Sequence, residues 1–177
     1  MRCPIPRCRC SCSRCARRPR SPDTSACAER TAALRAHPGF DASDANGVNV
    51  QIIQSSCLLA QREFIRSLDV ADGAIASAAR IPETPTLLAL ARAMRADVLN
   101  ATLRHDEALR ELEAAGAALP TDDPWSMRPY LQTLEAKALW GAGRRDEARR
   151  VARETAPQLD GADAEAFDAW MRDVGLR

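Results

Sequence analysis

The chain has 177 residues, a length typical of one domain, and its net charge at pH 7 is +1. Residues 1–20 hold seven arginines and no acid, which leaves 18 basic residues against 24 acids in the remainder. An acidic body excludes a broad nucleic-acid surface, because such a surface needs clustered Lys or Arg. No stretch approaches the roughly 18 apolar residues of a membrane helix, and no apolar run follows the basic start as in a secretory signal. We therefore expect a cytoplasmic protein with reduced thiols that binds neither nucleic acid nor membrane.

Residues 1–23 form an arm rich in Cys and Arg, and five of the seven cysteines lie at or before Cys15. The run Cys8-x-Cys10-x-Cys12-x-x-Cys15 suggests metal binding or redox chemistry, since thiolates bind zinc and iron–sulfur clusters. Structural zinc sites usually pair two Cys knuckles across an intervening stretch, which is missing here. The Pro, Arg and Ser bias without apolar periodicity predicts a disordered arm, and a metal or redox role is the alternative.

Residues 24–177 show helical hydrophobic spacing, and no window has the alternation of a β-strand. Pro38-Gly39 ends the first predicted helix, and Thr84-Pro85 has the pattern of an N-cap followed by proline in the first turn. The expected helices cover 24–37, 48–67, 69–80, 85–102, 105–118, a segment from 124–129 to about 141, 144–157 and 163–173. Cys27 and Cys57 fall in helical patterns and are interpreted as small buried hydrophobic residues.

These elements predict an all-α fold in one domain over residues 24–177. Seven to eight helices joined by short loops favour an antiparallel helix-pair solenoid over a four-helix bundle, with the last helix as a C-terminal cap.

One phrase occurs twice, first as residues 104–110 (RHDEALR) and again as 144–150 (RRDEARR). Its paired acids suggest catalytic carboxylates, but their place in the repeat predicts the first turn of a helix, where acids favour the macrodipole. Arg110 and Arg150 lie three or four residues further on and are expected to pair with them. His37 and His105 share no context, and no phosphate-binding loop, nucleophile elbow or zinc-protease motif occurs. We expect no enzyme, and no catalytic, cofactor or metal residues.

The chain resembles the tetratricopeptide-repeat family over about residues 55–160. Ala96-x-x-Leu99 followed by the first copy of the phrase resembles one repeat, and Ala136-x-x-Leu139 followed by the second copy resembles another. Ala74, Ala78 and Pro82 suggest an earlier copy, because the interval from Ala74 to Ala108 equals the repeat length of that family, about 34 residues. Ala108 and Ala148 are 40 apart, which predicts an insertion of six.

The resemblance implies a protein–protein interaction scaffold whose ligand lies along the first helix of each pair, on the concave face. An array that begins within a unit suggests the C-terminal part of a larger bacterial regulator. The alternatives for the groove are a solvated surface or one filled by a neighbouring domain. Projecting the concave face selects the partner-binding residues Glu63, Arg66, Asp97, Asn100, Tyr130, Lys137 and Trp140. Asn100 would bind the peptide backbone, and Trp140 would anchor a side chain.

Overall fold

The computed structural model of the chain describes residues 22–122 and 127–176, and within them every regular element is a helix. These elements are α1 (Pro22–Arg35), α2 (Ala45–Ala60), α3 (Phe64–Ala78), α4 (Pro85–Ala101), α5 (His105–Ala118), α6 (Met127–Gly141), α7 (Arg145–Thr155), the short 3-10 helix η2 (Ala156–Gln158) and α8 (Gly161–Asp173). The all-α prediction is therefore confirmed for this part of the chain. None of its helices is both long enough and apolar enough to cross a membrane.

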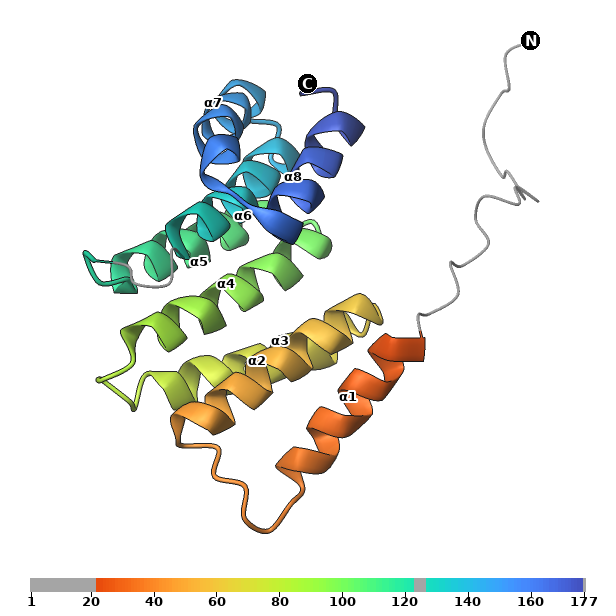
Figure 1. Cartoon of the computed structure of the whole chain (residues 1–177), viewed down its shortest axis with the longest axis vertical. Coiled ribbons are helices and arrows are strands. Elements are labelled where there is room, and N and C mark those ends of the chain that lie inside the picture. Colours follow the sequence, from red (N-terminus) through yellow and green to blue (C-terminus); the bar gives the residue numbers. More distant parts are fainter. Residues whose placement is uncertain (1–21, 123–126, 177) are drawn as a thin grey trace, which may run out of the picture.

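The helices pack in chain order, each against the next, from α1 to α7, and η2 links α7 to α8 (Figure 1). Three hairpins result, α2–α3, α4–α5 and α6–α7. The first helices of these hairpins also contact one another, α2 with α4 and α4 with α6. No comparably extensive contact joins the second helices α3, α5 and α7 across the described residues. The first helices thus form a closer layer than the second helices.

The three hairpins turn in the same way. Each turn has a residue with positive φ, the left-handed conformation that closes a helix in a Schellman motif, and the next N–H bonds back to the first helix. The positive-φ residues are Arg62 (62°), Leu103 (63°) and Gly143 (80°). The returning bonds run from Glu63 N to Leu58 O, Arg104 N to Leu99 O and Arg144 N to Leu139 O, each 2.9 Å long.

These turns set the repeat register, because positions 62, 103 and 143 follow one another at nearly equal intervals. The expected helix over 48–67 is wrong because this span includes the first turn, so α2 ends at Ala60 and α3 begins at Phe64. The pairing of Ala74 with Ala108 as equivalent repeat positions is wrong as well. Ser67 occupies the place of Ala108, and both N–H groups bond four residues back to the turn.

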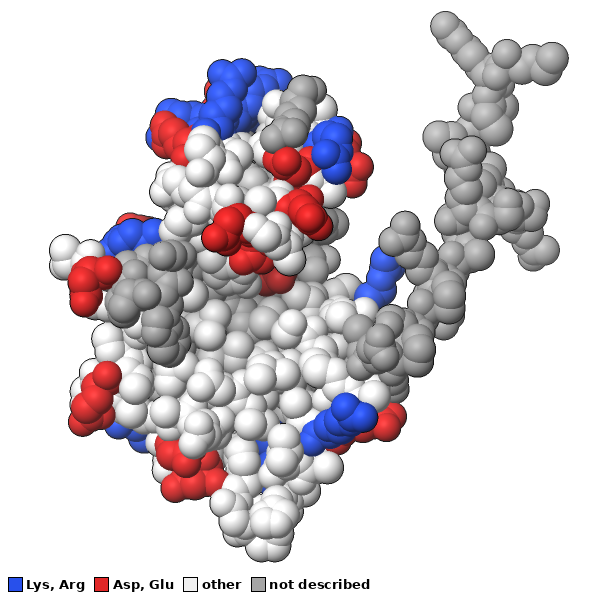
Figure 2. Space-filling view, in the orientation of Figure 1, with Lys and Arg blue, Asp and Glu red and all other residues white. Residues whose placement is uncertain are grey.

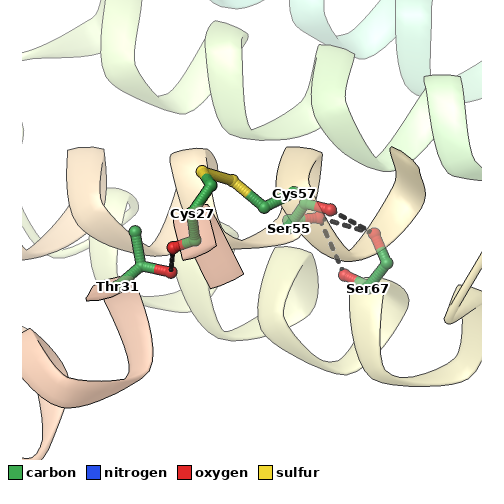
Figure 3. Close-up of a disulfide and its surroundings, with 5 residues drawn as sticks. All are labelled: Cys27, Thr31, Ser55, Cys57 and Ser67. Carbon is green, nitrogen blue, oxygen red and sulfur yellow. Dashed lines mark hydrogen bonds between the residues drawn. A yellow bond between two sulfur atoms is a disulfide. The ribbon is translucent and has the colours of Figure 1, made fainter. Parts of the chain in front are cut away.

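A pair of small residues lies where the two helices of each hairpin cross. The pairs are Ser55 with Ser67, Ala96 with Ala108 and Ala136 with Ala148, all with 0% exposure. Ser55 Oγ donates to Ser67 O (2.9 Å) and Ser67 Oγ donates to Ser55 O (2.8 Å), as Figure 3 shows. The buried hydroxyls of the first hairpin are therefore satisfied by the backbone, as a buried polar group requires.

A disulfide joins Cys27 of α1 to Cys57 of α2, with 6.0 Å between their Cα atoms (Figure 3). The expectation of reduced thiols is therefore wrong for this pair, whereas the expected burial of Cys57 is confirmed. Arg35 Nη1 adds a hydrogen bond of 2.7 Å to Gln54 Oε1 of α2. Disulfides persist mainly in oxidising compartments and are rare in the cytosol. The disulfide therefore does not support the expected cytoplasmic location, which remains a prediction.

The C-terminal helix α8 packs against the last hairpin. Phe167 and Met171 are buried in one cluster with residues of α6 and α7, and Trp170 stacks on Phe167 with 5.3 Å between ring centroids. Two further clusters form the rest of the core, one across α2, α3 and α4 and one across α4, α5 and α6. The helix expected over 163–173 is therefore present, and its buried residues face the last hairpin.

Candidate functional site

Three of the predicted partner-binding residues lie together between α4 and α6. The positive charge of Lys137 of α6 acts on the pKa of Asp97 of α4. The negative charge of Asp97 acts in turn on the pKa of Tyr130 of α6. Positions 97 and 137 are equivalent in their hairpins, because each lies six residues before the positive-φ residue of its turn. We call these three side chains the α4/α6 cluster.

Burial controls the protonation of the cluster. It raises the pKa of Asp97, although the charge of Lys137 opposes the shift. Burial, together with the negative charges of Asp97 and Asp163, raises the pKa of Tyr130 to about 12. The phenol thus stays a neutral hydrogen-bonding group at physiological pH, and the cluster offers one cation, one carboxyl and one hydroxyl.

The acid on α8 extends this site beyond the two hairpins. Asp163 lies in the first turn of α8 and acts on Tyr130, so α8 comes close to the cluster. On the face drawn in Figure 2, acidic side chains gather over α8, whereas few charged side chains lie over α2 and α4. The sequence does not point to Asp163, because nothing in the repeat pattern places the start of the C-terminal helix beside Tyr130.

Both polar atoms of the Asn100 amide form hydrogen bonds within the protein. Its Nδ2 donates to Leu134 O of α6 (3.3 Å), and its Oδ1 lies 3.2 Å from His105 Nδ1 at the start of α5. The imidazole of His105 lies so close to Gly141 that a Cβ there would overlap the ring. Asn100 therefore ties α4, α5 and α6 together.

Trp140 is half-buried against the cluster of α6, α7 and α8. The guanidinium carbon of Arg145 lies 3.8 Å from the centroid of its ring, a cation–π contact. This contact covers one face of the ring that was predicted to anchor a ligand.

Glu63 and Arg66 lie at the start of α3, a second helix, where they form an ion pair with each other. Their selection followed from the wrong helix boundary, which placed them on a first helix. In the register of the turns, Glu63 and Arg66 occupy the positions that Arg104 and Glu107 occupy in the next hairpin. Arg104 binds Glu107 through two bonds of 2.7 and 2.6 Å, and Arg144 binds Glu147 in the same way.

The two glutamates of the phrase are thus bound by the arginine three residues before them. The expected partner Arg150 lies instead beside Glu154 (3.4 Å), and Arg149 pairs with Asp146 (2.9 Å). Both glutamates have a lowered pKa because their arginine donates to them. These acids are structural features of the hairpin turns.

No group of three or more His, Cys, Asp or Glu side chains that could hold a metal occurs in residues 22–122 and 127–176. The cysteine run of the predicted arm lies outside those residues, so its metal or redox role remains a prediction. No protein-family model matches the chain, and comparisons with curated proteins and with solved structures gave no match either.

Proposed function

We propose that this protein is a TPR-like helical repeat module that binds an extended segment of a partner protein on the α4/α6 cluster. The observation that carries the proposal is that Asp97, Tyr130 and Lys137 come together from two successive first helices. Repeat modules bind peptides through such side chains because each repeat supplies residues at the same place along one surface.

The register of the hairpins supports a solenoid. Turns of one geometry recur at nearly equal intervals along the chain, small residues fill every crossing, and first helices contact first helices. A repeat longer than the roughly 34 residues typical of the family still stacks in this way, provided that each unit covers the apolar face of the next.

The chemistry of the surroundings indicates the partner segment. On the face drawn in Figure 2 few charged side chains lie over α2 and α4, and Ile53 of α2 is 51% exposed, which suits apolar side chains. The acids over α8, including Asp163, suit a basic side chain at one end of the segment. Lys137 is placed to pair with an acidic group or a backbone carbonyl of the same segment.

Capture from a native lysate, followed by titration of the bound segment as a synthetic peptide, tests this proposal. We expect Lys137→Glu to weaken binding at least tenfold, or about 1.4 kcal/mol, because it reverses the one cation of the cluster. Arg66→Ala is the matched control and should bind as the wild type does, because Arg66 lies at the turn into α3. Unchanged affinity in both Lys137→Glu and Tyr130→Ala would exclude the α4/α6 cluster as the binding surface.

A further inference from the structure

The chain has two equivalent junctions between hairpins. The first junction consists of α3, α4 and α5, and the second of α5, α6 and α7. The register of the turns aligns them residue by residue. The equivalent pairs are Asp72 with Glu113, Arg92 with Gln132, Arg95 with Glu135, and Glu111 with Val151.

The first junction is closed by arginines of α4. Arg95 Nε donates to Asp72 Oδ1 of α3 (2.6 Å), and its Nη1 donates to Glu111 Oε1 of α5 (3.1 Å). Arg92 Nη1 binds the other oxygen of Glu111 (3.0 Å). One guanidinium thus links three helices, and its side chain is only 23% exposed.

The second junction is open. A pocket of about 430 Å³ lies between α5 and α6. Gly116 is part of its wall, and a Cβ built there would meet no atom within 4 Å. The other lining residues are Leu109, Leu112, Glu113, Arg128, Leu131, Gln132, Glu135, Leu139 and Arg144. This volume lies within the range of about 300–1,000 Å³ for ligand pockets.

The carboxylates of the pocket have no ion-pair partner among the described residues. Glu113 and Glu135 form none, whereas Arg144 is held by Glu147 and Arg128 donates to Pro120 O (3.3 Å). Burial raises the pKa of Glu135. The positive charges of Arg150 and Arg144 oppose this shift, and the negative charges of Glu147 and Glu154 add to it. In the second junction a carboxylate, Glu135, thus occupies the position of the Arg95 guanidinium, while Glu113 keeps the position of Asp72.

We propose that the pocket of the second junction binds an arginine side chain presented by a partner protein. A guanidinium there would reach Glu113 and Glu135 together, as Arg95 reaches Asp72 and Glu111 in the first junction. Its planar fork suits two carboxylates better than a lysine ammonium does, and the leucines of the wall suit its methylene stem.

This site is separate from the α4/α6 cluster. Glu135 and Lys137 are two residues apart in α6, which places them roughly 200° apart around the helix. The pocket therefore binds its arginine whether or not a segment occupies the other side of α6, and its test is independent of the proposed function.

The test uses N-acetyl-L-arginine amide as the probe, with the citrulline analogue as a control of the same shape without charge. Titration into the full chain, followed by NMR, should shift the amide resonances of α5 and α6 around Glu113 and Glu135. We expect at least tenfold weaker binding of the citrulline probe. Equal binding of the two probes would overturn the proposal.

Two variants locate the binding. Glu135→Arg places a guanidinium inside the pocket, and Gly116→Leu fills the open space beside α5 at a helical position where glycine is unfavourable. Each should abolish the shifts, while Glu83→Arg adds the same charge on the exposed α3–α4 connection and should leave them unchanged. Arginine shifts that persist in Gly116→Leu, with its helical content intact by circular dichroism, would contradict the assignment.

Discussion

The two junctions have the same frame and opposite contents. In the first, Arg95 draws together acids from α3 and α5, whereas in the second an acid stands in its place and a pocket remains. Since the turns and the crossings are equivalent, the difference between the two junctions comes from a few side chains within them. A helical repeat can therefore keep its architecture while one junction serves stability and the other is available for binding.

The largest expected effect comes from removing the cation that closes the first junction. Arg95→Ala should lower the free energy of unfolding by about 1–3 kcal/mol, because Glu111 loses one of its two arginines in a largely buried place. The matched variant Glu135→Ala should change it by less than about 0.5 kcal/mol, since no ion pair is lost. Urea unfolding of the two variants measures both values, and equal losses would remove the distinction between the junctions.

The equivalence of the hairpin turns can be tested at Leu103. This side chain is 79% exposed and its φ is +63°, so Leu103→Gly should stabilise the protein by about 0.5–1 kcal/mol. Gly143→Ala is the reciprocal change at the equivalent turn, where a Cβ meets no atom within 4 Å and only the backbone conformation matters. It should cost about 1 kcal/mol. Thermal melts in which Leu103→Gly does not raise the melting temperature while Gly143→Ala lowers it would argue against a shared turn geometry.

The open junction should also give a pH-dependent signature. The pKa of Glu135 is raised in the folded state, so the folded chain binds more protons than the unfolded chain above the ordinary value of 4.5. The contribution of Glu135 to the free energy of unfolding therefore falls as the pH rises from 4.5 through its raised pKa in the folded state. The difference in unfolding free energy between Glu135→Gln and the wild type should increase with pH from about 4 to about 7. A flat or decreasing difference would mean that Glu135 is not desolvated.

The smallest effect is expected at the crossing of the first hairpin. The double substitution Ser55→Ala with Ser67→Ala reproduces the alanine pairs of the other two hairpins and removes both hydroxyls together with their bonds. The acceptors, Ser67 O and Ser55 O, are backbone carbonyls inside helices that still accept an N–H from four residues further on. No buried group is left unsatisfied, so the change should stay within about 0.5 kcal/mol. Ser67→Leu is the contrasting variant, and its tolerance in a urea melt would show that the crossing is not tightly packed.

Sequence patterns predicted the helices and the hairpin turns of the second and third pairs, where Ala96 and Ala108 and the repeated acids stand out. They failed at the first pair, because Arg62 gives no turn signal and serines replace the alanines. The two small residues of every crossing are separated by the same interval, as in Ser55 and Ser67, and this shared interval was the signal that could have found the first pair.

The three residues of the α4/α6 cluster were selected from the repeat resemblance, which implies that equivalent positions of successive first helices share one face. Contacts that the repeat resemblance does not imply were beyond the reach of sequence reasoning. The link of Cys27 to Cys57, the approach of Asp163 to Tyr130 and the place of Glu135 against α5 depend on how hairpins stack. No local pattern encodes that stacking.

The most direct measurement is a double-mutant cycle between positions 135 and 113, in which urea unfolding gives the coupling free energy. In the Glu135→Arg background, Glu113→Ala should remove a favourable coupling of about 0.5–1 kcal/mol, because the new arginine and Glu113 reproduce the pair of Arg95 and Asp72. In the wild-type background the coupling should be zero or repulsive. If removal of Glu113 costs the Glu135→Arg variant nothing, the two junctions are not equivalent, and residue 135 does not decide whether the second junction is open.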